Sequence, residues 1–300
     1  MDKQQSTAIL RLLLGASLIS FSAVFVKVMD VAPTPSAFYR VLIGGLILLS
    51  VSLIRYTKFL RDLRFLGLAF VCGLLFASDL GMWHQSILYV GPGLATILGN
   101  FQVFFLALFG ILIYKEQITV RLGMSFVLAV FGLFLIFGLD WNQLGTHYKL
   151  GILLGIGTAL SYAGYVLVLR KLQSNLRGHS SVTILAVVSL ATALFLGVLG
   201  LIQGQSFAVP NPTDWGYLGT YAVFSQVLGW ILISKALPAI DVSRAGLILL
   251  LQPGLAFVWD ILFFQRPTQW IEIIGAGIAL TAIYLGTISK SDSAVKKAEN

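Results

Sequence analysis

Charge is scarce in this sequence. Only 11% of its 300 residues are Asp, Glu, Lys or Arg, whereas 58% are hydrophobic. A soluble protein of this length needs a larger polar surface, so the composition excludes a pair of soluble domains. No polar stretch is long enough to form a separate soluble domain. The fold must therefore expose a mostly apolar surface, which a lipid bilayer can cover.

Residues that carry common cofactor chemistry are also few. Cys72 is the only cysteine, which excludes an intrachain disulfide. The histidines His84, His147 and His179 lie on separate segments, so no metal cluster is predicted. A phosphate-binding loop and a Gly-x-Ser-x-Gly motif are both absent, which argues against ATP-driven transport by this chain alone and against a hydrolase. We therefore expect no cofactor, no metal and no catalytic residues.

Long apolar runs make up most of the chain. A helix needs roughly 20 apolar residues to cross about 30 Å of hydrocarbon. Ten runs reach that length, at about 8–28, 35–54, 64–89, 92–114, 121–139, 150–170, 181–203, 214–236, 241–264 and 270–288. They predict an all-α integral membrane protein with ten transmembrane helices. The first run lacks a small-residue cleavage site, so we expect a retained helix rather than a signal peptide.

Basic residues predict the orientation of these helices. With the N-terminus inside, 16 Lys and Arg fall in inner segments and three in outer segments, while Arg40 lies within a span. This distribution predicts cytoplasmic termini and an outer Lys149. The dispersed charge suits anionic lipid, and we expect no nucleic-acid partner. Because Asn211 precedes a proline, no Asn-x-Ser/Thr acceptor is usable, which favours a bacterial inner membrane.

Ten spans divide into two sets of five. We expect residues 1–145 to form a first five-helix repeat and residues 146–289 a second, with residues 290–300 as a cytoplasmic tail. Because five is odd, a tandem second copy inserts upside down, and substrate sites of such inverted repeats lie near midplane between the halves. A shift of 150 residues aligns the fourth and fifth spans with the ninth and tenth and places Gln102 on Gln252.

Several stretches resemble the EamA-type branch of the drug/metabolite transporter superfamily. The resemblance rests on residues 245–258, AGLILLLQPGLAFV, on Tyr114 to Gln117 with its glutamate, on Arg40, and on Ser161 to Ala163. The sequence departs from the family at two positions, because Val103 replaces the proline of the first half and Arg266 replaces the glutamate of the second half. The resemblance implies a ten-helix transporter with cytoplasmic ends that moves small metabolites, amino acids, nucleotides, sugars or drugs, often outward.

Ionisable residues within the spans are candidate functional groups. Each costs at least about 2.5–3.5 kcal/mol to insert, which makes it a site hypothesis by default. Arg40, Asp79, His84 and Asp260 are placed in the outer half or at midplane. Arg40 can pair with Asp79 or with Asp260, and the sequence does not choose between them. The alternative to a substrate site is a structural ion pair, or, for Asp260 and His84, a solvated position near the membrane surface.

Four amides and four aromatic residues complete the predicted site. The amides Asn100, Gln102, Gln226 and Gln252 lie near the estimated midplane, where they either bind substrate or join helices by hydrogen bonds. Residues two apart point about 200° apart on a helix, so we expect Asn100 and Gln102 not to face one cavity. The aromatic candidates, which line the cavity or pack beside it, are Trp83, Tyr162, Tyr165 and Trp259.

Two further patterns bear on helix geometry. Gly151, Gly155, Ala159 and Ala163 recur every four residues and predict a groove for close helix packing, with a sliding surface as the alternative. Pro253 lies in the middle of the ninth span, where it removes one helical hydrogen bond and predicts a kink.

These features favour a secondary transporter or facilitator that exports small amphipathic metabolites such as amino acids, by alternating access around a midplane cavity between the two repeats. Asp79, together with His84, is the candidate proton-linked group, and protons are the candidate coupling ion; without such titration the protein would be a passive facilitator. A membrane-embedded enzyme acting on a lipid-linked substrate is the alternative, although paired carboxylates at one membrane face are missing. A structural or sensory protein would leave the polar midplane residues unexplained. The oligomeric state stays open.

Overall fold

The computed structural model describes residues 3–55, 62–137, 146–174, 179–265 and 267–288. Within those ranges all regular secondary structure is helical. The helices are α1 Lys3–Ser20, α2 Ser22–Val28, α3 Pro33–Arg55, α4 Leu63–Asn100, α5 Gln102–Tyr114, α6 Val120–Phe137, α7 Thr146–Ser174, α8 Ser181–Ile202, α9 Pro212–Tyr221, η2 Ala222–Gly229, α10 Trp230–Ala236, η3 Leu237–Ala239, α11 Val242–Leu249, α12 Leu251–Phe264 and α13 Trp270–Ile288. The predicted tail and Arg266 lie outside the described residues.

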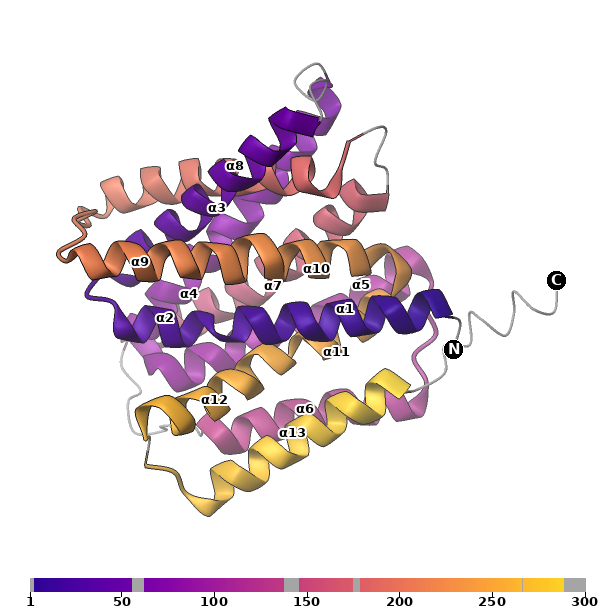
Figure 1. Ribbon diagram of the computed structural model, residues 1–300. Helices are drawn as coiled ribbons and strands as arrows, with labels where there is room; N and C mark the ends of the chain where they lie inside the picture. The colour runs from indigo at the N-terminus through magenta and orange to yellow at the C-terminus, as the bar shows by residue number, and fades with distance from the viewer. Residues whose placement is uncertain (1–2, 56–61, 138–145, 175–178, 266, 289–300) are drawn as a thin grey trace.

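The helices confirm the membrane architecture expected from the apolar runs. Eight helical stretches are long and apolar enough to cross a membrane, and Val120–Leu135 and Trp270–Gly286 are shorter apolar helices. Together they coincide with the ten predicted spans. Helix α1 begins and α13 ends on the same side of the molecule (Figure 1), as an even number of crossings requires.

Close packing between α4 and α7 uses the small residues of the predicted groove. A Cβ added at Gly151 would lie 2.5 Å from Val90 Cγ1, and one at Gly155 would lie 2.7 Å from Leu98 Cβ. Only glycine permits such an approach, so the close-packing interpretation of this pattern is confirmed. Elsewhere α3 packs along α8 and α6 along α13 at opposite edges of the bundle (Figure 1).

Two spans are interrupted at nearly equivalent places in the two halves of the chain. Phe101 separates α4 from α5, with φ −61° and ψ −8°. Leu250 separates α11 from α12, with φ −64° and ψ −11°. The second break agrees with the kink expected at Pro253, whose missing N–H cannot bond one turn back to Leu249. Broken helices of this kind surround the binding sites of many transporters.

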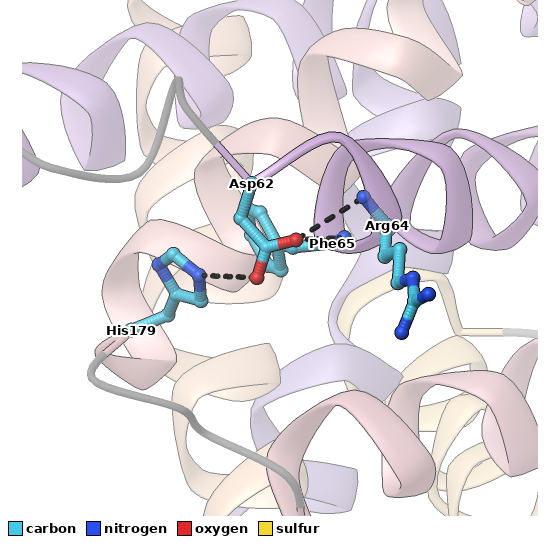
Figure 2. A network of polar contacts seen from close by, with 4 residues as sticks. All are labelled: Asp62, Arg64, Phe65 and His179. Carbon is cyan, nitrogen blue, oxygen red and sulfur yellow. Dashed lines mark hydrogen bonds and ion pairs between the residues drawn. The ribbon is translucent and has the colours of Figure 1, made fainter.

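The start of α4 is fixed by a charged cap (Figure 2). Asp62 Oδ1 accepts hydrogen bonds from the backbone N–H groups of Arg64 at 3.1 Å and Phe65 at 3.0 Å, and Oδ2 lies 3.5 Å from His179 Nε2. The bond from Phe65 is the main reason that the pKa of Asp62 lies below its ordinary value; His179 acts in the same direction, whereas burial opposes it. His179 also stacks on the Phe65 ring at 4.1 Å. This contact joins the chain before α4 to the chain before α8.

Candidate functional site

A cavity of about 700 Å³ lies among the helices of both halves. Its walls come from α1 to α5 in the first half and from α7, α9, α10, α11 and α12 in the second. The partly exposed Lys27 and Asp260 lie at its mouth. Nine of the twelve predicted site residues line it: Arg40, Asp79, Trp83, His84, Asn100, Gln102, Tyr162, Gln252 and Asp260.

Arg40 is the buried cation of this cavity. Its side chain comes from the first half of α3 and is only 5% exposed. Nη1 donates to the Tyr221 hydroxyl at 3.1 Å, and the guanidinium carbon lies 5.4 Å from the centroid of the Phe76 ring and 5.3 Å from that of Tyr221. Nε is buried and has no hydrogen-bond partner among the described residues. The two rings therefore hold the guanidinium while leaving part of its donor fork unused.

Asp79 and Asp260 are the two carboxylates predicted as possible ion-pair partners of Arg40. Neither forms an ion pair with it among the described residues. Asp260 instead pairs with Lys27 at 2.7 Å, across the mouth between α12 and α2, so a pairing of Arg40 with Asp260 is wrong. Asp79 is 7% exposed on α4 and forms no ion pair with Arg40 within the described structure. Asp79 and Trp83 both face the cavity, as their spacing of four residues predicts.

Neutral polar groups of the cavity are partly paired. Thr34 Oγ1 lies 3.0 Å from His84 Nδ1. Asn100 Nδ2 donates to the Thr96 carbonyl at 2.7 Å, and Gln252 Nε2 donates to the Tyr162 hydroxyl at 3.4 Å. In the described part of the chain, buried Gln102 Oε1 has no partner.

The expectation that Asn100 and Gln102 face different surroundings is wrong. It assumes one regular helix, in which a spacing of two residues separates side chains by about 200°. The helix instead breaks at Phe101, between the two amides. The break changes the direction of the second side chain, and both amides line the cavity.

Three predicted residues lie outside the lining. Tyr165 is fully buried behind it, stacked on Phe76 at 4.4 Å. Gln226 Nε2 donates to Ser189 Oγ at 2.8 Å and so joins η2 to α8. Of the two roles predicted for this amide, substrate binding or a hydrogen bond between helices, the structure shows the second. Trp259 Nε1 donates to Ser20 Oγ at 2.7 Å, and its ring stacks on Phe21 at 4.6 Å.

The opposite end of the bundle is closed by Glu116, whose role the sequence reasoning missed. Its Oε1 accepts from the Val242 N–H at 2.6 Å, and its Oε2 accepts from the Ser243 N–H at 3.1 Å and from Ser243 Oγ at 2.8 Å. The carboxylate thus caps α11, which lacks a side-chain cap from Asp241. A Cβ at Gly110 would lie 2.5 Å from Oε2, so only glycine leaves room for this contact.

Arg170 reinforces the same closed end. It donates from Nη1 to the Ile240 carbonyl, and its guanidinium lies 4.9 Å from the Tyr114 ring centroid. Between this layer and the cavity, Leu106 and Ile248 are fully buried. The contacts of Glu116 and Arg170 thus pack this end of the bundle, whereas Lys27 and Asp260 at the other end are partly exposed.

Sequence reasoning also missed several lining residues. Phe76 precedes Asp79 by three residues on α4, so its helical spacing could have indicated the shared face. Lys27, Tyr221 and Trp230 carry no such signal, because they lie on other helices whose rotation is set by packing. Among the residues described, no group of three or more His, Cys, Asp or Glu could hold a metal ion.

Discontinuous helices around a solute-sized cavity are typical of solute transporters. The model of the EamA-like transporter family matches residues 6–138 and again residues 149–288. The chain therefore belongs to the EamA-like transporter family and is an integral membrane transporter of small molecules.

Individual relatives agree with this assignment. An uncharacterized transporter of Haemophilus influenzae is 26% identical over 268 residues, covering 84% of each chain. The uncharacterized transporter YetK of Bacillus subtilis is 26% identical over 180 residues, which span 59% of this chain and about half (54%) of YetK. One crystal structure shares the fold with a TM-score of 0.79 and 16% identity, covering 94% of this chain and 97% of the other.

Proposed function

We propose that the protein is a secondary transporter or facilitator that exports small amphipathic metabolites, such as amino acids. The observation that carries the proposal is the cavity itself, which combines buried charge and amides with aromatic and aliphatic walls. Polar groups suit the charged part of such a solute, and rings such as Phe76 and Trp230 suit its apolar part.

Alternating access follows from the same proposal. The partly exposed Lys27–Asp260 pair lies at the mouth of the cavity and the Glu116 contacts lie at the other end, so a second state must release the Glu116 contacts and shut the mouth. The family model matches each half once, which supports residues 1–145 and 146–289 as inverted repeats. With cytoplasmic termini in a bacterial inner membrane, the cavity described here faces outward. Asp79 is the proposed proton-linked group.

Transport is tested in two steps with purified protein. A thermal-shift screen against a metabolite library identifies ligands, because a solute that binds the folded state raises its apparent stability. Radiolabelled ligands are then followed in proteoliposomes, with protein-free vesicles as the control. Concentration-dependent, saturable flux supports the proposal, whereas binding without flux contradicts it.

The proposed topology predicts that Lys149→Cys, in a Cys72→Ser background, reacts with a membrane-impermeant maleimide in intact cells. Lys149 is exposed and Cys72 is buried, so the background label should be small. The matched control is Arg64→Cys, on the opposite side, which should react only after permeabilisation. The reverse pattern for the two positions would contradict cytoplasmic termini.

Gln102→Ala and Gln252→Ala are each expected to weaken substrate binding by roughly 5- to 10-fold, the loss of about one hydrogen bond. Both amides line the cavity, from the two broken helices. Isothermal titration with a ligand from the screen measures the change. Gln226→Ala is the control, because Gln226 lies outside the lining and bonds Ser189. Unchanged affinity in both variants would leave these amides with a packing role.

A further inference from the structure

Arg40 holds an unusual amount of unused hydrogen-bonding capacity for a buried group. A guanidinium presents a rigid fork of N–H donors that matches a carboxylate in geometry. Here one donor reaches the Tyr221 hydroxyl, at 3.1 Å, while buried Nε has no partner in the part of the chain that the structure describes. Nearly complete burial, at 5% exposure, makes this arrangement unfavourable unless another group supplies acceptors.

Aromatic rings and a hydroxyl, rather than a carboxylate, contact the Arg40 guanidinium. Phe76 and Tyr221 contact the guanidinium through their rings, which attract a cation but accept none of its protons. No ion pair to Arg40 exists within the described ranges, although Asp79 also lines the cavity. Asp260, the other carboxylate of the lining, is already paired with Lys27. The cavity thus contains a cation that is held in place by rings and has no carboxylate within ion-pair distance among the described residues.

From this geometry we infer that Arg40 forms an anion subsite that selects solutes bearing a carboxylate. The solute's carboxylate accepts from guanidinium N–H groups that Tyr221 does not occupy, as carboxylates do at arginine sites. Phe76 and Tyr221 hold the guanidinium in position, and both also line the cavity. The inference rests on the proposed function, because it specifies which charged group the transported solute must carry.

The test uses probes that share a side chain and differ in charged groups. One set is L-leucine, 3-methylbutylamine, which lacks the carboxylate, and 4-methylpentanoate, which lacks the ammonium. The second set is L-phenylalanine, phenethylamine and 3-phenylpropanoate, because the walls include both aliphatic and aromatic side chains. Binding is measured on the full-length protein by isothermal titration, and flux of the same probes is measured in proteoliposomes.

In the unsubstituted protein, we expect the carboxylate-bearing members of a set to bind at least about tenfold more tightly than the amine. Arg40→Gln should weaken binding of the carboxylates by roughly 10- to 100-fold and leave the amine within about twofold. Tyr221→Phe keeps the charge and the ring but removes the hydroxyl, so it should weaken carboxylate binding less. Arg64→Gln, an exposed arginine outside the cavity, is the matched control and should change nothing.

Each other outcome contradicts the inference. If Arg40→Gln weakens binding of the amine and of the carboxylates equally, Arg40 has a structural role. A thermal unfolding curve shows whether the variant is folded. If Arg40→Gln is misfolded, the binding of carboxylates by Tyr221→Phe provides the test instead. Amines that bind and cross as well as carboxylates would overturn the anion subsite while leaving the transport proposal intact. Failure of every probe to bind or cross, with folded protein, would overturn both.

Discussion

Glu116→Gln is expected to open the closed end of the bundle and to reduce net flux at least tenfold. Three donors, the Val242 N–H and the N–H and hydroxyl of Ser243, all point at the Glu116 carboxylate. Glutamine replaces one acceptor oxygen by a donor and removes the negative charge at the start of α11. The lost interaction of about 1–2 kcal/mol amounts to roughly a tenfold shift between conformations.

Cysteine accessibility measures this shift directly. Ala245 on α11 is fully buried behind the Glu116 contact, so Ala245→Cys in a Cys72→Ser background reports opening of that end. Its rate of maleimide labelling should rise about tenfold when Glu116→Gln is added, the factor given by the same free energy. Glu272→Gln makes the same chemical change at the first turn of α13 and should leave the rate unchanged. Equal rates in all three proteins would contradict a gating role for Glu116.

Asp79→Asn is expected to keep substrate binding and exchange but to abolish the dependence of net flux on a pH gradient. Asparagine keeps the shape and hydrogen-bonding ability of the side chain and removes its titration. Because Asp79 forms no ion pair with Arg40 among the described residues, the melting temperature should stay close to that of the unsubstituted protein. Proteoliposomes with and without an imposed pH gradient give the measurement.

Two results would redirect this assignment. Poor folding of Asp79→Asn, partly rescued by Arg40→Gln in the same chain, would show that the two residues act as a structural pair, because breaking a buried pair leaves one uncompensated charge. Normal stability together with normal pH-dependent flux would remove both roles from Asp79. Asp260→Asn is the matched control, since Asp260 already pairs with Lys27 at the mouth.

The sequence predicts the helices well because each must satisfy its own backbone in lipid and must therefore be long and apolar. Such a requirement is local, and all ten runs correspond to helices. The direction of a side chain near a helix break, by contrast, depends on the geometry of the break and not on the local apolar pattern. Asn100 and Gln102 illustrate this, because the interruption at Phe101 brings both to one cavity against the regular helical angle.

Contacts between distant helices were harder to predict. Asp260 pairs with Lys27, although no sequence pattern favours Lys27 over Arg40 as its partner, and Glu116 caps a helix more than a hundred residues away. Both contacts depend on how helices rotate when they pack. The identity of the intramembrane polar residues was nevertheless informative, since nine of the twelve candidates line the cavity.

The contact between α4 and α7 has a mechanical consequence. Glycines bring these helices together, and α4 belongs to the first half of the chain whereas α7 belongs to the second. The pairs α3 with α8 and α6 with α13 join the halves in the same way. The helices of each half thus pack mainly against helices of the other half. Two rigid halves that moved apart would break all three pairs, so the contacts favour mixed groups of helices from both halves as the moving units of the proposed cycle.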